Sequence, residues 1–342
     1  MRELIITIQD ADQRLDRFLQ KAIPGLPGIL AQKYIRQKRI RLNGKRAQPK
    51  DRLAAGDVIA LYIPADCFDT PKTSKTYQKT AKPKLDICYE DRQILIINKA
   101  PNLLCHSGDR PGAVTLVDQV KAYLYHSGAW RPEDSLSFAP ALCNRLDRNT
   151  GGLVIAAKTA AALKGINEKI RNLEVEKSYL LAVHGRPNPP TGMIYAHMRK
   201  DQREKKSTVI AHEIIAAEQG EGADAQADTC QAKEKLAVLR YDTLETTDEN
   251  LSLVECQLIT GRFHQIRAQM AAIGCPVLGD RKYGGDADYK QEPQQALWAW
   301  QIRFAFTTDA GELEYLNGRR FRSPHIPFLA RYFQGGDYPC LR

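Results

Sequence analysis

Residues 143–158 read Cys-Asn-Arg-Leu-Asp-Arg-Asn-Thr-Gly-Gly-Leu-Val-Ile-Ala-Ala-Lys, a polar turn that leads into an apolar run. The run Leu153–Ala157 predicts a buried strand, because the two glycines before it supply the backbone freedom of a turn. Asp147 lies in this turn between Arg145 and Arg148. A neighbouring guanidinium favours the charged form of a carboxylate. The segment alone therefore fits a structural ion pair, the more common case, or an anionic nucleophile.

The bulk composition is that of a globular protein with two domains. The chain has 342 residues, of which 43% are hydrophobic and 26% charged, and this length can bury a sizeable core. No apolar run reaches about 18 residues, so we expect neither a membrane span nor a signal peptide. The eight cysteines form no Cys-x-x-Cys pair and the histidines have no metal-ligand spacing, which predicts a cytoplasmic protein without metal.

Positive charge is concentrated near the N-terminus. The chain carries 50 Lys and Arg against 40 Asp and Glu, a net charge of +10. Residues 33–52 hold nine basic side chains and one acid, a density that suits phosphates better than a merely solvated lysine-rich face. The residues expected to contact RNA are Lys33, Arg36, Lys38, Arg39, Arg41, Lys45 and Arg46.

The pattern around this basic stretch predicts a small α/β domain over residues 1–66. In chain order it contains an amphipathic helix from Leu15, a Pro-Gly loop at 24–28, a helix at about 29–37, an Asn43-Gly44 turn and a strand at 58–63. This layout resembles the small RNA-binding domain of the ribosomal-protein-S-four-like type. Residues 67–84 are rich in lysine and threonine and poor in aliphatic side chains, so we expect a flexible linker there.

Residues 85–342 predict an α+β domain with flanking helices around a mixed, largely antiparallel β-sheet. Strands are expected at 94–97, 153–157, 175–184 and 251–260, and helices at 159–172 and after the turn at 261–267. Gly274 is a suitable C-terminal cap for the last helix. Residues 211–235, rich in Ala, Glu, Gln, Gly and Asp, predict an exposed insertion between strands.

Four segments of this domain, in order, resemble the pseudouridine synthases of the RluA-like branch. They are the strand into Asn98-Lys99-Ala100-Pro101, then 144–152, then Glu176-Lys177-Ser178-Tyr179-Leu180-Leu181-Ala182, and finally Gly261-Arg262-Phe263-His264-Gln265-Ile266-Arg267 with Gly279-Asp280. The resemblance covers about residues 85–325, and a basic N-terminal domain is a common companion in that family. The chain departs from the pattern at Asn144, where the family has His, and at Gly151, where it has Ser.

The resemblance implies that uridine in RNA is converted to its C-glycoside isomer without any cofactor. Asp147 would be the nucleophile or carboxylate initiator, Arg267 its ion-pair partner with Arg262 as the alternative, and Tyr179 the side chain against the target base. Arg145 would enter the RNA helix as the base leaves it. Arg262 and His264 complete the expected substrate-binding set, although His264 could also only brace the turn before its helix.

The leading hypothesis is a monomeric pseudouridine synthase acting on structured RNA, with large-subunit ribosomal RNA preferred and transfer RNA possible. One alternative is an RNA-binding assembly factor that has lost catalysis, which the joint presence of Asp147, Tyr179 and Arg267 disfavours. Another is a carboxylate-nucleophile hydrolase unrelated to RNA. The basic stretch at 33–52 and the lack of a second acid placed to activate water argue against this last class.

Overall fold

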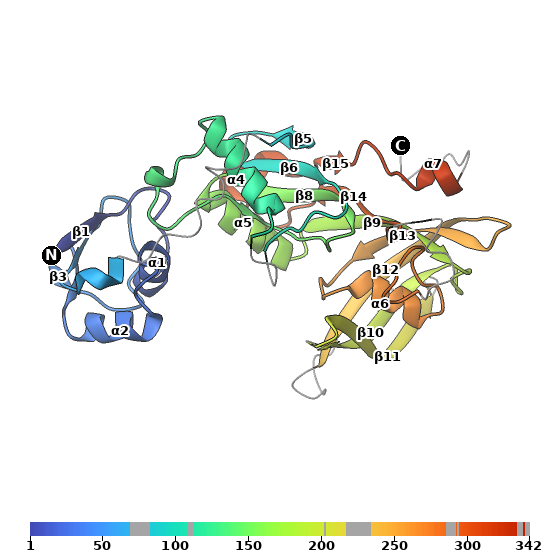
Figure 1. Ribbon diagram of the computed structural model, residues 1–342, viewed down its shortest axis with the longest axis horizontal. Helices are drawn as coiled ribbons and strands as arrows, with labels where there is room; N and C mark the ends of the chain where they lie inside the picture. The colour runs from blue at the N-terminus through green and yellow to red at the C-terminus, as the bar shows by residue number, and fades with distance from the viewer. Residues whose placement is uncertain are drawn as a thin grey trace.

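The computed structural model describes residues 1–68, 83–107, 112–201, 203–216, 234–284, 292, 294–333 and 338. They form a small N-terminal domain and a larger domain built on one long sheet, and the small domain lies at one end of the molecule (Figure 1). The α+β class expected from the sequence is confirmed. No helix of the described residues is both long and apolar enough to cross a bilayer.

The N-terminal domain packs two helices against a four-stranded antiparallel sheet. The helices are α1 (Leu15–Ala22) and α2 (Gly28–Arg36), and the strands, in sheet order, are β1 (Arg2–Ile5), β4 (Val58–Leu61), β2 (Ile40–Leu42) and β3 (Lys45–Arg46). Asn43 and Gly44 both have positive φ and join β2 to β3, as the two-residue hairpin turn requires. Strand β1 was not expected from the sequence.

The expected start of the linker at residue 67 is wrong. A short 3₁₀ helix, η1 (Ala65–Phe68), follows β4, and Cys67 is buried against the core of the N-terminal domain. A cysteine behaves as a small apolar side chain in such a core, so the ordered domain continues through the first linker position. Residues 69–82, the greater part of the expected linker, lie outside the described residues.

The larger domain is organised by a sheet whose only parallel pair in the described part of the chain is β8 with β14. Its order is β11 (Lys206–Ala216), β10 (Thr191–Asp201), β12 (Glu234–Thr246), β13 (Leu251–Leu258), β9 (Val175–His184), β14 (Leu297–Phe304), β8 (Gly151–Ala157), β6 (Ile94–Lys99) and β5 (Ile87–Glu90). Two short strands complete it, with β15 (Arg320–Arg322) on β14 and β7 (Ala141–Leu142) on β8. A mixed, largely antiparallel sheet is thus confirmed.

Helices cover both faces of the β6–β8 region. Leu95 and Ile97 of β6 share a core with α4 (Leu116–His126), whereas Ile94 and Ile96 share one with α5 (Ala160–Arg171). Successive side chains of a strand point to opposite faces, so both strands must be apolar along their whole length. This burial explains why β6 and β8 show continuous apolar runs in the sequence.

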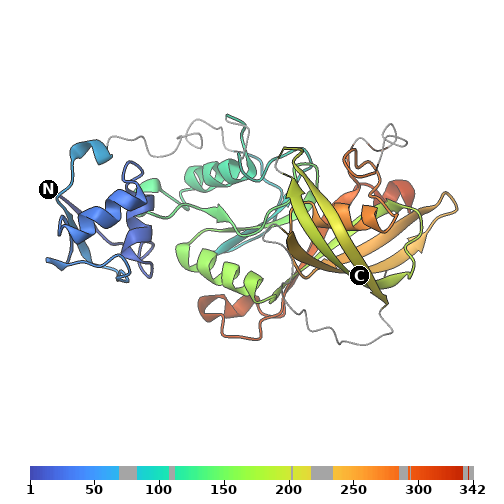
Figure 2. The ribbon, with the colours of Figure 1, turned by 90° about the horizontal axis from the view of Figure 1, so that it is seen from below.

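The other half of the sheet, from β9 to β11, curves around helix α6 (Gln265–Ala272) (Figure 2). The chain closes with a 3₁₀ turn, η4 (Gly311–Leu316), and helix α7 (Leu329–Tyr332). The expected insertion at 211–235 needs correction at both ends, because 211–216 belong to β11 and pair with β10, and 234–235 begin β12. Residues 217–233 lie outside the described residues.

Candidate active site

The turn that carries Asp147 is fastened to the strand that follows it. The side chain of Asn144 continues the ladder of β8, since its Oδ1 accepts from the Ile155 N–H at 2.8 Å and its Nδ2 donates to the Leu153 carbonyl at 3.4 Å. The Thr150 N–H donates to the Asp147 carbonyl at 3.2 Å and closes the turn. Asn144, which stands where the family has His, therefore braces the turn through backbone contacts.

The two glycines at the start of β8 are required by the strand beside it. A Cβ on Gly151 would lie 2.1 Å from the Trp298 ring, and a Cβ on Gly152, whose φ is +110°, would lie 2.2 Å from the Ala299 carbonyl oxygen. No side chain fits at such distances, because closely packed interiors have no room to yield. Gly151, which stands where the family has Ser, thus leaves room for the Trp298 ring on β14.

The charge partner of Asp147 comes from α6. Arg267 Nη1 lies 3.0 Å from Asp147 Oδ2, while its Nε and Nη2 donate to the two oxygens of Asp280 at 2.6 and 2.8 Å. Burial tends to raise the pKa of Asp280, but the hydrogen bonds and charge of Arg267 outweigh it and hold that pKa below its usual value. The buried guanidinium of Arg267 thus pairs with both Asp147 and Asp280, and both acids line the same cleft.

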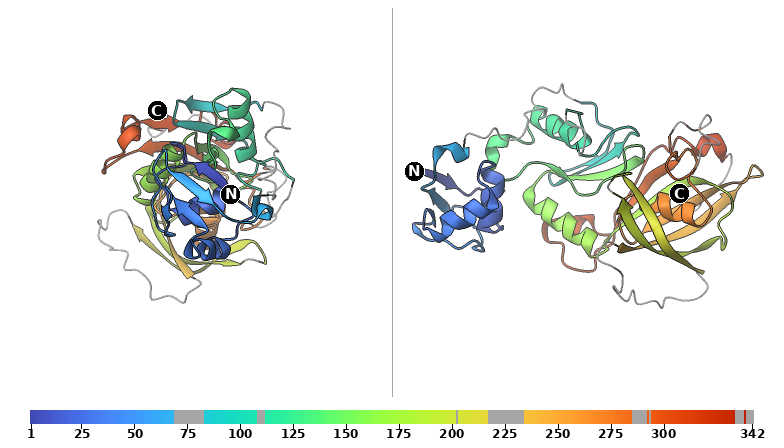
Figure 3. Two further views of the ribbon diagram at one scale, coloured as in Figure 1. Left: turned by 90° about the vertical axis from the view of Figure 1, so that its left-hand side faces the viewer. Right: turned by 60° about the horizontal axis from the view of Figure 1, so that its bottom comes forward.

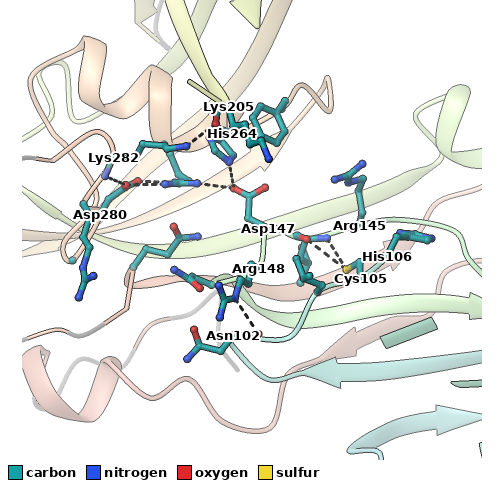
Figure 4. Close-up of a pocket in the computed structure, with 18 residues that line it drawn as sticks. Asn102, Cys105, His106, Arg145, Asp147, Arg148, Lys205, His264, Asp280 and Lys282 are labelled. Atoms are coloured by element: carbon teal, nitrogen blue, oxygen red, sulfur yellow. Dashed lines mark hydrogen bonds and ion pairs between the residues drawn. The ribbon is translucent and has the colours of Figure 1, made fainter. Parts of the chain in front are cut away.

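The two arginines next to Asp147 in the sequence do not pair with it. Arg148 donates through Nε to the Asn102 carbonyl at 3.3 Å, and the exposed Arg145 lies away from the carboxylate, beside His106 (Figure 4). Arg262, the alternative partner, donates through Nε to the Leu236 carbonyl at 2.9 Å. The expectation that Asp147 is held between the guanidinium groups of its sequence neighbours is therefore wrong. Arg145 and Arg262 nevertheless line the hollow around Asp147.

His264 faces the same carboxylate oxygen from the N-terminus of α6. Its Nε2 lies 3.6 Å from Asp147 Oδ2, and its Nδ1 lies 3.1 Å from the Tyr283 hydroxyl, which accepts from the Ser207 N–H at 2.7 Å. The phenol proton is then free to point at Nδ1, which places the imidazole proton on Nε2, towards Asp147. Burial, reinforced by the charge of Arg267, lowers the pKa of His264 to about 4.

The depressed pKa of His264 predicts a pH-dependent loss of stability that an Asn variant lacks. His264 has a pKa of 6.5 in the unfolded chain and of about 4 in the folded protein. Between these pH values the unfolded chain binds the proton more strongly, so the free energy of unfolding decreases as the pH falls. Between pH 7 and pH 5 the wild type should lose about 2 kcal/mol relative to His264→Asn. Asn tolerates the left-handed backbone at this position (φ 55°).

Denaturant unfolding of both proteins at the two pH values measures this difference. Equal losses in the two proteins would show that His264 titrates in the folded state as it does in the unfolded chain. His212→Asn, at an exposed position of β11, serves as the matched histidine control.

Tyr179 lines the hollow that Asp147, Arg267 and Leu297 also line. It is 6% exposed and belongs to the main core of the domain. Burial, together with the nearby charge of Asp147, raises the pKa of Tyr179 above its usual value. The phenol therefore keeps its proton at neutral pH and is an uncharged group in the same hollow as the carboxylate.

Lys99, from the Asn98-Lys99-Ala100-Pro101 segment, was not among the expected site residues, yet it supports the turn that carries Asp147. It is 1% exposed, and its Nζ donates to the carbonyls of Ala100, Leu103 and Arg148 at 2.9, 2.9 and 3.1 Å. Burial lowers the pKa of Lys99 to about 8. A periodicity of two along β6 could have identified it, because Lys99 lies on the face of the inward-pointing Leu95 and Ile97.

Asp147, His264 and Arg267 line a cleft of about 620 Å³ between the Asp147 turn and the start of α6 (Figure 4). Lys205, Arg281 and Lys282 contribute positive charge to its walls, and Phe263 contributes an aromatic ring stacked on His264 at 3.8 Å between centroids. In the described part of the chain no three His, Cys, Asp or Glu side chains converge as metal ligands. Two carboxylates, those of Asp147 and Asp280, line the cleft together with six Arg and Lys side chains. This excess of positive charge suits a polyanionic substrate.

Comparison with known proteins matches both domains to described families. The RNA pseudouridylate synthase family model matches residues 93–272, and the S4 domain model matches residues 13–59. The chain is 32% identical over 294 residues to ribosomal large subunit pseudouridine synthase C of Rickettsia bellii, covering 83% of this chain and 87% of that protein. For the Haemophilus influenzae protein of the same description, identity is 28% over 325 residues, with 92% and 90% covered.

Solved structures show the same fold. Human RNA pseudouridylate synthase domain containing 4 superposes with a TM-score of 0.52 at 21% identity, over 71% of this chain and 90% of that one. The small basic domain seen in the fold corresponds to the S4 match, and the long sheet with its Asp147 cleft corresponds to the catalytic match. The chain therefore belongs to the RNA pseudouridine synthases, the RluA-like isomerases of RNA uridine, and carries an S4 domain at its N-terminal end.

Proposed function

We propose that the protein isomerises specific uridines of large-subunit ribosomal RNA, using Asp147 as the reacting carboxylate. The observation that carries the proposal is the contact of Asp147 with the buried Arg267 inside a positively charged cleft. The substrate class follows relatives described as ribosomal large subunit pseudouridine synthases. Transfer RNA is the second candidate substrate, and the protein is taken to act as a monomer in the cytoplasm.

The cleft can perform the reaction only on a uridine that has left its base stack. Extruding a nucleotide costs a few kcal/mol, and the positive side chains around the cleft would offset part of that cost by binding the phosphates of the extruded strand. Asp147 then either attacks the ribose, which breaks the N-glycosidic bond, or assists deprotonation of the ribose, which releases the uracil. The uracil turns, and its C5 is joined to the sugar as the bond to Asp147 breaks or as the ribose proton returns. The proton on C5 then leaves and N1 carries a proton, so the product is an isomer of the substrate. Arg267 balances the charge of the carboxylate through these steps.

The other site residues have roles that suit their positions. Tyr179, buried and protonated, would lie against the uracil ring and limit its movement while it turns. Arg145 is exposed on the rim and free of ion pairs in the described residues, so it can enter the space that the extruded base leaves. Arg262 would contact a phosphate at the other end of the hollow, and His264 would hold Asp147 through its Nε2–H.

The basic face of the S4 domain would bind the RNA outside the cleft. All seven predicted side chains are exposed on or beside α2, β2 and β3, and none pairs with an acid among the described residues. Arg39 and Arg41 lie over the rings of Tyr34 and Tyr62 at 5.7 and 5.5 Å. Such unpaired, partly ordered cations bind phosphates with little loss of existing contacts.

Neutralising this face should flatten the salt dependence of RNA binding. In the variant Arg36→Gln/Arg41→Gln/Arg46→Gln, each lost phosphate contact reduces the slope of log K against log salt by roughly 0.7–0.9, so a fall of about 2 is expected. Filter binding to a large-subunit rRNA transcript across a salt series measures the slope. The control Arg92→Gln/Arg171→Gln/Arg320→Gln removes equal charge from exposed positions elsewhere. If both variants lose the same slope, the S4 face is not the RNA contact.

The modified position can be found by mapping pseudouridines in ribosomal and transfer RNA from cells with and without the gene. Loss of a modification from large-subunit rRNA supports the proposal. A loss confined to transfer RNA would show that transfer RNA is the substrate instead. An unchanged map in both RNAs would favour the alternative of an RNA-binding assembly factor without catalysis.

A further inference from the structure

Residues Gln9-Asp10-Ala11-Asp12-Gln13, just before Arg14 and α1, lie between the S4 domain and the catalytic domain. We infer that this segment is a docking strip that holds the S4 domain in one orientation, so that its basic face and the catalytic cleft engage one folded RNA together. The inference rests on the proposed binding of RNA by that face. It makes Asp10 a positioning residue for substrate selection, distant from the chemistry of Asp147.

Asp10 is the centre of the contact. Its side chain is fully buried, and its two oxygens accept five hydrogen bonds, of which four come from the catalytic domain. The donors are Ser135 Oγ at 2.7 Å, the Leu136 N–H at 2.9 Å, the Ser137 N–H at 2.8 Å, Ser137 Oγ at 2.6 Å and, within the S4 domain, Thr7 Oγ1 at 2.8 Å. Only an ionised carboxylate accepts at every one of these positions.

The surroundings of Asp10 are built for an anion. Burial raises the pKa of Asp10, but the hydrogen bonds from Leu136, Ser137, Ser135 and Thr7 outweigh it and leave that pKa below its usual value. Hydrogen bonds to a charged acceptor are stronger than neutral ones, and a buried charge without them is very costly. The catalytic domain therefore supplies the donors that make burial of this side chain possible.

The rest of the strip contacts a second element of the catalytic domain. Gln9 Oε1 accepts from the N–H of Ala160 at 2.9 Å, at the start of α5, and Asp12 pairs with Lys164 on the same helix. Gln13 Nε2 donates to Ser137 Oγ at 2.8 Å. Contacts with both the 135–138 segment and α5 oppose rotation of the S4 domain about either one alone.

The 135–138 segment also connects the docking contact to the active site. Leu136 packs against the core of the S4 domain, and the chain then runs through β7 directly into the Asp147 turn. In Figure 3 this part of the chain reaches out from the catalytic domain to meet the S4 domain. A domain fixed in this way needs no further ordering when it binds, so both contacts with an RNA of matching shape form at a lower entropic cost.

Asp10→Asn in the full chain tests the inference. The amide would turn an NH₂ group towards N–H and O–H donors, so the docking contact should break while the S4 fold is kept. Energy transfer between one fluorophore on each domain reports orientation. Isomerisation is then measured on a large-subunit rRNA transcript and on a short stem-loop cut from it around the mapped uridine. Glu3→Gln, exposed on β1 of the same domain, is the matched control.

For Asp10→Asn we expect a broader distribution of distances between the two fluorophores. We also expect kcat/KM on the transcript to fall by about tenfold, while activity on the stem-loop is unchanged. Ser137→Ala provides a second variant, which removes one of the hydrogen bonds to Asp10 by a change in the catalytic domain. An unaltered distance distribution in both variants overturns the docking role. A broadened distribution with equal kcat/KM on both RNAs overturns the role in selection. If the proposed function itself is wrong, the wild-type protein will isomerise neither RNA, which distinguishes that outcome from failure of the docking inference.

Discussion

Asp147→Asn is expected to lower the isomerisation rate by at least about 10⁴-fold, since removing a nucleophile from a preorganised site commonly costs this much. Asn is nearly isosteric with Asp, and Arg267 keeps both of its bonds to Asp280. The affinity for RNA and the free energy of unfolding should therefore change little. Single-turnover rates on the transcript, together with binding and unfolding measurements, separate these quantities.

The matched control for Asp147→Asn is Glu168→Gln, which removes one exposed negative charge from α5. It should leave the isomerisation rate at the wild-type value. An Asp147→Asn protein that isomerises uridine normally, or that loses RNA affinity as well as activity, would make this carboxylate a structural anchor of the turn.

Replacing Arg267 should have the second-largest effect, because one guanidinium serves both Asp147 and Asp280. Arg267→Gln leaves the Asp280 side chain, which is 1% exposed, buried without its countercharge. Breaking a buried pair in this way costs roughly 3–5 kcal/mol. Arg267→Lys keeps the charge but loses the fork that reaches two acids, so it should lose less stability and still lower the isomerisation rate, by about 100-fold.

A double-mutant cycle with Asp280→Asn distinguishes the two consequences of losing Arg267. Residues in direct contact couple by about 0.5–3 kcal/mol, so Arg267→Gln/Asp280→Asn should recover part of the stability lost by Arg267→Gln. It should recover none of the activity, because Asp147 still lacks its partner. Recovery of both would show that Arg267 acts on catalysis only through the stability of the fold.

Local patterns predicted some of the elements accurately. The alternation at 175–184 predicted β9 with the bounds that the structure has, and the helix expected at 159–172 is α5 with Thr159 as its N-cap. Gly274 follows α6 with positive φ, as predicted for a C-terminal cap. These features depend on neighbouring residues only, which is why they can be read along the chain.

Contacts between distant segments could not be predicted in the same way. The burial of Lys99, the bond of Asn144 to β8 and the match of Gly151 to Trp298 all depend on which segments lie side by side. The docking of Asp10 onto residues 135–137 joins segments about 125 residues apart. No periodicity or composition encodes such pairs, because many arrangements of a sheet satisfy the same apolar pattern.

The sequence by itself determined the α+β class, the basic N-terminal domain and the acid in the turn before β8, since short-range patterning and motif order carry that information. Residue patterns alone pointed to Arg145 and Arg148 as partners of Asp147, and only the family resemblance named Arg267; the contact itself is seen in the tertiary structure. The nearest candidates along the chain, Arg145 and Arg148, turn elsewhere, and Arg267 arrives from α6. Electrostatic contact depends on distance in space, and the fold sets that distance by packing α6 against the curved half of the sheet.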